Sequence, residues 1–286
     1  MLWLRLIRLQ QWAKNFLLFA PLLFALQFSI NGWLTVSLGF VAFSLLASAA
    51  YIMNDLIDVA ADRIHPMKRL RPLASNQLSQ TTAAIGAALL LMMALGISVF
   101  LPWQFGVILL SYGLMNVLYS CGLKKIVLID VIIISIGFVL RILAGSALIA
   151  VTTSHWILLC TFFGSLFIGF AKRKHEVDSL ADHSKEHRNA LQYYSAGLLQ
   201  QLIGITATLT IISYSLYTID EQTIDHFQTD KLYLTIIFVA FAIFHYFHII
   251  YNQATSGDPT KTFLSDKPLL ITLVLWLISF FTIVFI

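Results

Sequence analysis

Charged residues are scarce in this sequence of 286 residues, of which Asp, Glu, Lys and Arg make up only 11%. Soluble domains carry about 25% charged residues, so a water-soluble domain is excluded, and disorder needs more charge still. Cysteine is rarer, because only Cys121 and Cys160 occur, both in or beside apolar runs. This excludes a disulfide framework and a cysteine-based zinc site. The sequence also has no basic tail of the kind that binds nucleic acid.

Long hydrophobic runs fill most of the chain. Hydrophobic residues make up 59% of it, and the mean hydropathy is +0.84. A transmembrane helix needs ~20 mostly apolar residues. We therefore expect an all-α, polytopic membrane protein whose nine transmembrane helices cover residues 15–30, 33–53, 81–100, 103–121, 127–150, 154–171, 195–218, 232–251 and 268–285.

The distribution of Lys and Arg predicts the orientation of these spans. Sixteen of the 18 basic residues fall in segments on one side of the predicted topology. Loops rich in Lys and Arg are retained in the cytoplasm. We expect a multi-pass protein of the cell inner (plasma) membrane with its N-terminus in the cytoplasm, and nine spans then place the C-terminus outside.

An acidic segment follows the second predicted span. If that helix continues to Asp62, then Asn54, Asp58 and Asp62 lie at positions i, i+4 and i+8 and share about 80° of its surface, with Asp55 on the same face about 20° beyond Asp62. Like charges at this spacing repel, and a divalent cation would remove the conflict. Carboxylate and amide oxygens in a sparse set suit Mg²⁺, which also binds substrate phosphates.

Basic residues follow the acids within the same loop. Lys68, Arg69 and Arg71 lie between Pro66 and Pro72, and proline breaks helices. The two prolines should therefore let the cations fold back toward the acids. There the cations could contact phosphate oxygens directly.

A second charged loop follows the sixth predicted span. It contains Lys172 and Arg173 and the acids Glu176, Asp178 and Asp182. The three acids cannot all line one helical face, since Glu176 lies about 120° from Asp182 on an ideal helix. We expect Glu176 to accept a hydrogen bond from a ribose hydroxyl or a metal-bound water, whereas solvation explains Asp178 equally well.

Arg141 lies near the middle of the fifth predicted span, where an ionisable side chain is costly and usually functional. Asp130 is on the same stripe of that helix but ~16 Å away along its axis, too far for a direct pair. We expect both to face a polar cavity, with Arg141 bound to a phosphate or carboxylate. The alternative is a structural lock between Arg141 and a polar group of another helix.

The acidic motif, the charged loop after the sixth span and the nine spans resemble the UbiA superfamily of intramembrane prenyltransferases. Within it, several blocks are similar to the branch that transfers phosphoribosyl groups to polyprenyl phosphates. These blocks comprise residues 8–15, 62–72, 119–124, 130–145 and 172–176, and the resemblance extends from about residue 8 to 195.

The resemblance implies one UbiA-like transmembrane domain over residues 1–286, with a central cavity open to the cytoplasm and to lipid. Its cytosolic active-site loops would be about 54–80, 121–127 and 172–194. The implied reaction transfers 5-phosphoribosyl from phosphoribosyl diphosphate (PRPP) to a decaprenyl-type polyprenyl phosphate and releases diphosphate. The implied cofactor is Mg²⁺, bound by Asn54, Asp58 and Asp62.

The residues of this predicted site fall into two groups. The expected catalytic residues are Asp58, Asp62, Arg141 and Glu176. The expected substrate-binding residues are Lys14, Asn15, Asp55, Arg63, Lys68, Arg71, Tyr119, Lys124, Asp130, Lys172 and Arg173.

Two alternative functions stay open. A prenyltransferase that moves an isoprenoid from its diphosphate to an aromatic acceptor would use the same Mg²⁺ and acids. The His65-Pro66 pair, the block 11–15 and Arg141 argue against it. A transporter or flippase of a phosphorylated lipid would show internal repeats, and none is evident. The sequence does not reveal the lipid's chain length, and it leaves a homo-oligomer possible.

Overall fold

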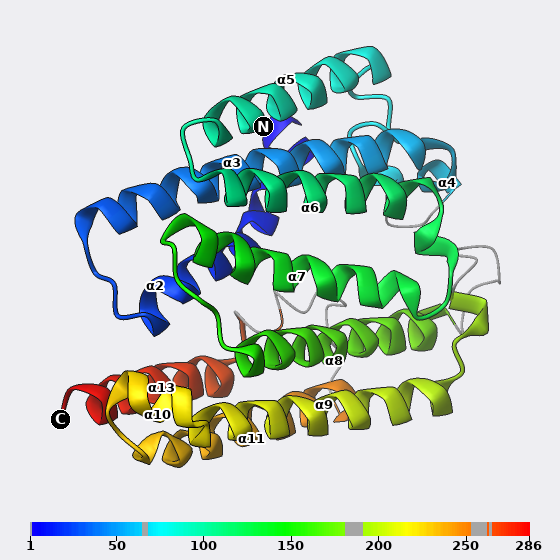
Figure 1. Cartoon of the computed structure of the whole chain (residues 1–286). Coiled ribbons are helices and arrows are strands. Elements are labelled where there is room, and N and C mark those ends of the chain that lie inside the picture. The colour runs from blue at the N-terminus through cyan, green and yellow to red at the C-terminus, as the bar shows by residue number, and fades with distance from the viewer. Residues whose placement is uncertain (1, 65–67, 181–190, 253–261, 263–264) are drawn as a thin grey trace. The chain divides into compact units, whose positions relative to one another are not determined.

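The structure is a computed structural model that describes residues 2–64, 68–180, 191–252, 262 and 265–286 (Figure 1). All regular elements among these residues are helices, which confirms the all-α class. Contacts divide the chain into two units, Met1–Thr153 and Ser154–Ile286, and each is described by itself below.

Within the residues that the structure describes, eight helices are long and apolar enough to cross a membrane. Each overlaps one of the nine expected spans, so hydrophobic runs of membrane length located these helices correctly. They are α3 (Ile30–Ile57), α5 (Gln80–Ser98), α6 (Trp103–Cys121), α7 (Ile129–Leu148), α8 (His155–Leu180), α9 (Ala196–Ile219), α11 (Ile236–Asn252) and α13 (Lys267–Phe285).

The expected helix over residues 15–30 is wrong as a single element. A short helix, α1 (Leu2–Leu6), precedes the 3₁₀ helix η1 (Leu9–Phe19), and α2 (Ala20–Phe24) follows η1 directly. Pro21 explains the break, because proline inside an α-helix removes a hydrogen bond and collides with the preceding turn. At the first turn of a helix proline is tolerated, and that is its position in α2.

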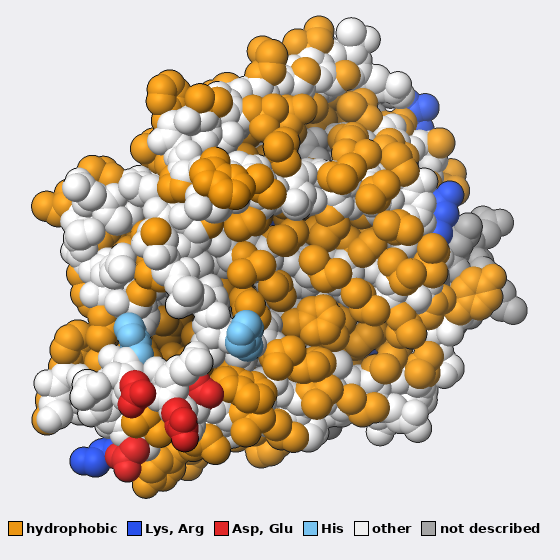
Figure 2. Space-filling model, viewed as in Figure 1, with side chains coloured by type: hydrophobic (Ala, Val, Ile, Leu, Met, Phe, Trp, Pro, Cys, Tyr) orange, Lys and Arg blue, Asp and Glu red, His pale blue; other side chains and the backbone are white. Residues whose placement is uncertain are grey.

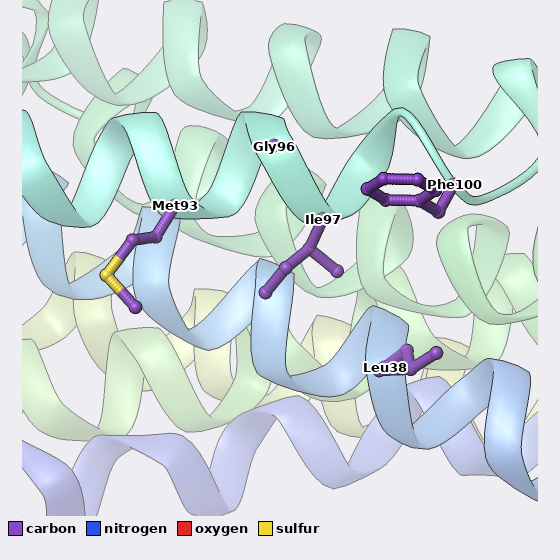
Figure 3. Close-up of a pocket in the computed structure, with 5 residues that line it drawn as sticks. All are labelled: Leu38, Met93, Gly96, Ile97 and Phe100. Carbon is purple, nitrogen blue, oxygen red and sulfur yellow. The ribbon is translucent and has the colours of Figure 1, made fainter.

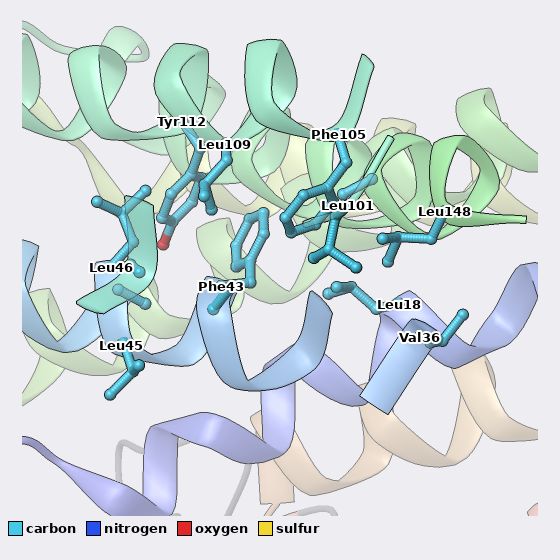
Figure 4. Packing of buried hydrophobic residues seen from close by; sticks show 14 of the residues in the cluster. Leu18, Val36, Phe43, Leu45, Leu46, Leu101, Phe105, Leu109, Tyr112 and Leu148 are labelled. Carbon is cyan, nitrogen blue, oxygen red and sulfur yellow. The ribbon is translucent and has the colours of Figure 1, made fainter. Parts of the chain in front are cut away.

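Helix α3 is central to the first unit, where it packs against α5, α6, α7 and η1. Figure 4 shows the core that these contacts enclose, with Phe43 of α3 lying beside Tyr112 and Phe105 of α6. The ring centroids of Phe43 and Tyr112 are 4.5 Å apart. Aromatic packing of this kind contributes beyond the burial of apolar area.

The spacing of polar residues along the 3₁₀ helix η1 matches the spacing of their partners along α3. The Trp12 Nε1 donates to Ser48 Oγ at 3.0 Å, and the Asn15 Nδ2 donates to Ser44 Oγ at 2.9 Å. Three residues of a 3₁₀ helix and four residues of an α-helix both advance by about 6 Å. The two polar pairs therefore stay in register along the antiparallel segments.

In the second unit, α8 packs on α9, α9 on α11, and α11 on α13. Shorter elements connect them: η4 (Leu191–Tyr193), α10 (Glu221–Phe227) and η5 (Lys231–Thr235). The Tyr214 hydroxyl of α9 shares a hydrogen bond of 2.7 Å with Thr235 Oγ1 and accepts another of 2.7 Å from Trp276 Nε1 of α13. These bonds satisfy polar groups among buried apolar side chains.

Hydrophobic side chains cover most of the face shown in Figure 2. Such a surface suits lipid rather than water. Figure 3 shows a pocket between α3 and α5 that is lined by Leu38, Met93, Gly96, Ile97 and Phe100. Because none of these side chains is polar, the pocket is no candidate for the chemistry that the charged loops imply.

Candidate active site

The acidic residues lie where α3 ends and α4 (Val59–Ile64) begins. Asp58 interrupts the helix with φ −92° and ψ 2°. The backbone bonds nevertheless continue, from Asp58 N to Asn54 O at 3.0 Å and from Asp62 N to Asp58 O at 2.8 Å. The expected spacing of i, i+4 and i+8 is therefore present, with one break. We call Asn54, Asp55, Asp58 and Asp62 the acid cluster.

Lys124 holds one half of the acid cluster. It lies on η3 (Leu123–Lys125), between α6 and α7. Its Nζ donates to Asp58 Oδ1 at 2.6 Å and to Asn54 Oδ1 at 3.0 Å. Ser120 Oγ donates to the same Asn54 oxygen at 3.3 Å, and Asn54 Nδ2 donates to Asp58 Oδ2 at 3.2 Å. The lysine nitrogen thus bridges two oxygens of the cluster.

Arg71 contacts the other two residues of the acid cluster, Asp55 and Asp62. Its Nη1 donates to Asp62 Oδ2 at 2.6 Å and to Asp55 Oδ1 at 3.0 Å. The segment that carries it, with η2 (Lys68–Leu70), returns from α4 toward α3. Arg71 therefore folds back onto the acids, as the sequence predicts for the cations of this loop. Pro72 follows Arg71 at the turn, whereas Pro66 lies outside the described residues.

Arg8 also reaches the acid cluster, and sequence reasoning did not assign it to the site. Its Nη2 lies 2.5 Å from Asp55 Oδ1, and its guanidinium lies over the Tyr51 ring at 5.1 Å. Its backbone is left-handed, with φ 52° and ψ 54°, which costs energy for a residue with a Cβ. The sequence did contain a signal for Arg8, because it is the first residue of the block 8–15 that is similar to the family branch described above.

The chain's own cations therefore neutralise the cluster. Asp55 and Asp62 have side chains only 4% and 5% exposed, and each is paired with an arginine; Asp58 is paired with Lys124. The repulsion that the sequence-based argument assigned to a divalent cation is therefore already relieved by the chain, because that argument compared the acids with one another and not with residues from other segments.

Arg141 is buried within the first unit. Its Nε donates to Asn15 Oδ1 at 2.8 Å, its Nη1 to the Gly137 carbonyl at 2.7 Å and its Nη2 to the Tyr112 hydroxyl at 3.0 Å. Aromatic rings, including that of Phe43, lie about its guanidinium. No carboxylate in the described part of the chain forms an ion pair with it. These contacts correspond to the alternative stated above, a structural lock between Arg141 and polar groups of other helices.

The other predicted residues of the first unit lie in varied surroundings. Arg63 donates to Asn76 Oδ1 at 2.7 Å and not to the acid cluster. Asp130 is buried in the first turn of α7. Lys14, Lys68 and Tyr119 are half-buried on η1, η2 and α6.

The second unit carries the remaining predicted residues on the last turns of α8. Arg173 is buried, and its Nη1 lies 2.5 Å from Glu176 Oε2. Lys172 is exposed. Lys174 pairs with Asp178 at 2.6 Å. Asp182 lies outside the described residues.

The donors of the acid cluster fit a magnesium ion in chemistry. Three or more His, Cys, Asp or Glu side chains arranged to hold a metal do not occur in the described ranges. Mg²⁺ does not need such a cage, because it binds through one or two carboxylates, waters and substrate phosphates. Asp58 and Asp62 with the Asn54 amide supply oxygens of that kind.

Comparisons with known proteins agree with this architecture. The model of the UbiA prenyltransferase family matches residues 16–274. The decaprenyl-phosphate phosphoribosyltransferase of Mycolicibacterium smegmatis is 31% identical, over 96% of this chain and 89% of its own. The enzyme of the same name from Corynebacterium glutamicum is 32% identical, over 96% and 83%.

Solved structures support the fold. A UbiA homologue from Archaeoglobus fulgidus, bound to GPP and Mg²⁺, matches with a TM-score of 0.74, 19% identity and full coverage of both chains. A structure described under digeranylgeranylglyceryl phosphate synthase matches with a TM-score of 0.69 and 19% identity, over 99% of this chain and 97% of its own.

Proposed function

Because the chain belongs to the UbiA prenyltransferase family, we propose that it transfers 5-phosphoribosyl from PRPP to a decaprenyl-type polyprenyl phosphate and releases diphosphate. Relatives of that name, at about 30% identity over nearly the whole chain, support the assignment. The observation that carries it is the convergence of Arg8, Arg71 and Lys124 on the acid cluster. An active site for this reaction must bind a diphosphate, a 5-phosphate and a lipid phosphate, and therefore needs many cations.

The proposed step breaks one bond and forms one. An oxygen of the lipid phosphate attacks C1 of the ribose, and the bond from C1 to the diphosphate oxygen breaks with its electron pair leaving on diphosphate. The lipid phosphate is already an anion near neutral pH, so the step needs no strong general base. Cations near the leaving oxygens stabilise the charge that develops there.

Asn54, Asp58 and Asp62 are the proposed ligands of Mg²⁺. The ion would neutralise the leaving diphosphate and orient it. Arg71, Lys124 and Arg8 would hold phosphate oxygens beside it, since guanidinium and ammonium groups form strong charge-assisted hydrogen bonds with phosphate. Glu176, whose carboxylate pairs with Arg173, would accept a hydrogen bond from a ribose hydroxyl or a metal-bound water.

We also propose that the membrane is the inner membrane, with the N-terminus in the cytoplasm and the C-terminus outside. This topology needs η1 and α2 to make the first crossing. A 3₁₀ helix rises about 2.0 Å per residue, so η1 and α2 laid end to end extend roughly 29 Å. That length is close to the ~30 Å hydrocarbon thickness of a bilayer.

The test uses purified protein in detergent with Mg²⁺ and a polyprenyl phosphate. Label from PRPP should appear in the lipid, and diphosphate should be released in equal amount. Transfer of a prenyl group from its diphosphate to an aromatic acceptor, without use of PRPP, would instead support the prenyltransferase. Movement of the phosphorylated lipid across a vesicle membrane, without chemistry, would support a flippase.

A further inference from the structure

Two nitrogen atoms occupy bridging positions in the acid cluster. Arg71 Nη1 contacts both Asp55 and Asp62, and Lys124 Nζ contacts both Asn54 and Asp58. Each is a positive group between two oxygen ligands, which is also the place of a bound metal ion. The oxygens proposed to bind Mg²⁺ are therefore already held by cations of the chain.

The three ion pairs of the acid cluster differ in which partner is exposed to solvent. Arg8 and Arg71 are 26% and 27% exposed, whereas their partners Asp55 and Asp62 are 4% and 5% exposed. In the third pair the order is reversed, because Lys124 is 9% and Asp58 27% exposed. The two arginines are thus partly open to solvent, while Lys124 is enclosed.

A metal ion alone binds this arrangement poorly. To reach Asp62 it must displace Arg71, which then keeps only Asp55 as its anion, and the local positive charge rises. Diphosphate alone also binds poorly, because both arginines are engaged and the buried carboxylates repel it. Separation of a buried pair without replacement leaves an uncompensated charge, which is strongly unfavourable.

We propose that the site loads by exchange of ion pairs: Arg71 and Arg8 move from Asp62 and Asp55 to the incoming diphosphate, while the metal takes the place of Arg71 on Asp62 and neutralises the neighbouring Asp55. Arginine suits this role because its planar fork matches carboxylate and phosphate alike. Metal and diphosphate then bind with strong positive coupling, and each promotes the other equally. The inference rests on the proposed function only in that a diphosphate-bearing donor binds here with a metal.

The experiment measures binding and not turnover. Detergent-solubilised protein is dialysed to equilibrium against Mn²⁺ alone, against radiolabelled inorganic diphosphate alone in a chelator, and against the Mn²⁺–diphosphate complex, and the Mn²⁺ and diphosphate retained by the protein are measured. For the unaltered chain we expect the complex to bind at least about tenfold more tightly than either component, which lies within the usual range of coupling.

The decisive variants remove one arginine each. In Arg71→Met and Arg8→Met we expect Mn²⁺ alone to bind several-fold more tightly, because its competitor is gone, and the Mn²⁺–diphosphate complex to bind several-fold more weakly. The matched controls are Arg69→Met and Arg5→Met, which remove the same charge from exposed positions two and three residues away and correct for long-range electrostatics.

Unchanged or weaker binding of Mn²⁺ alone in Arg71→Met, relative to Arg69→Met, would overturn the exchange. Arg71→Lys keeps the positive charge at this position, so Mn²⁺ alone should still bind weakly. This variant is the control for misfolding caused by substitution of Arg71. The two proposals fail separately. Loss of the coupling with intact transfer from PRPP refutes only the exchange, whereas coupling without any transfer from PRPP refutes only the proposed reaction.

Discussion

Asn15 joins η1 to Arg141 through a hydrogen bond of 2.8 Å from the guanidinium Nε to the amide oxygen. The Asn15 nitrogen donates to Ser44 of α3 at the same time. One amide therefore connects η1, α3 and α7 inside the first unit. Both Asn15 and Arg141 are buried, at 1% and 4% exposure, so this contact is stronger than its surface counterparts.

A double-mutant cycle should detect this connection. Asn15→Leu leaves a buried guanidinium N–H without its acceptor, so we expect a loss of about 1–3 kcal/mol in the free energy of unfolding. Asn15→Leu with Arg141→Met should lose less than the sum of the single changes, by about 1.5–3 kcal/mol. Unfolding in detergent micelles measures all three variants.

The control for this cycle is Asn116→Leu. Asn116 is half-buried, and its amide donates to the Tyr112 carbonyl of its own helix at 2.8 Å. It joins no two elements through that bond, so we expect a change of less than about 1 kcal/mol. Strict additivity of Asn15→Leu and Arg141→Met would contradict the lock.

Asp58→Asn and Asp62→Asn should each abolish most of the transfer activity. An amide keeps the shape of the carboxylate but loses the charge that binds a metal ion. We expect phosphoribosyl transfer to fall by at least about 100-fold, the scale reported for single groups that stabilise transition-state charge. Initial rates at saturating Mg²⁺ measure the change, and thermal unfolding checks that the variants fold.

Asp225→Asn is the matched control. Asp225 is exposed on α10, and its substitution removes one negative charge from the chain as the site variants do. Its transfer rate should stay within about twofold of the unaltered protein, because an exposed side chain with no role in the site contributes little. Activity in Asp62→Asn equal to that in Asp225→Asn would contradict the proposed metal ligand.

Gly145 allows η1 to approach α7 closely. A Cβ at this position would lie 2.2 Å from the Leu18 carbonyl oxygen. Because that obstacle is backbone, η1 would have to move, and Gly145→Ala should destabilise the protein by about 1–3 kcal/mol. Thermal unfolding measures the loss, and transfer activity should fall with it, since η1 also carries Lys14 and Asn15.

Gly106→Ala tests the same substitution where space is available. A Cβ at Gly106 of α6 meets nothing within 4 Å. Alanine is a better helix former than glycine by about 1 kcal/mol, so this variant should be neutral or slightly more stable. Equal destabilisation by Gly106→Ala and Gly145→Ala would show that close packing is not the cause.

Sequence predicted those features that depend on local patterns. Eight helices followed from apolar runs, because the length of a bilayer-spanning helix is fixed by physics. The spacing of Asn54, Asp58 and Asp62 followed from helical periodicity, and the return of Arg71 was predicted from helix-breaking prolines, of which Pro72 lies within the described residues. Each depends on residues close together in the chain.

Features that depend on distant residues were missed or misjudged. Arg8 and Asp55 are 47 residues apart, and no local pattern indicates their pairing. The 3₁₀ conformation of η1 follows from its register with α3, which a hydrophobic run cannot reveal. The supposed need for a metal arose because repulsion within one helix was considered without the cations from other segments.

Glu176 and Asp178 form a natural pair for testing the second unit. Both are acids near the end of α8, and each is ion-paired along the helix, with Arg173 at 2.5 Å and with Lys174 at 2.6 Å. They differ in burial, because the Glu176 side chain is 25% exposed and pairs with the buried Arg173, whereas Asp178 is 50% exposed. The role proposed for Glu176 predicts that the two positions respond differently to loss of charge.

Glu176→Gln should lower kcat/KM for PRPP by about tenfold or more, because it weakens the proposed hydrogen-bond acceptor and removes the charge that pairs with the buried Arg173. Asp178→Asn should change kcat/KM by less than about twofold, since exposed i, i+4 pairs contribute only a few tenths of a kcal/mol. If both variants lose activity equally while their unfolding temperatures also fall equally, Glu176 acts through the stability of α8 and not through the substrate. If Glu176→Gln loses activity at an unchanged unfolding temperature, the carboxylate acts on the reaction itself.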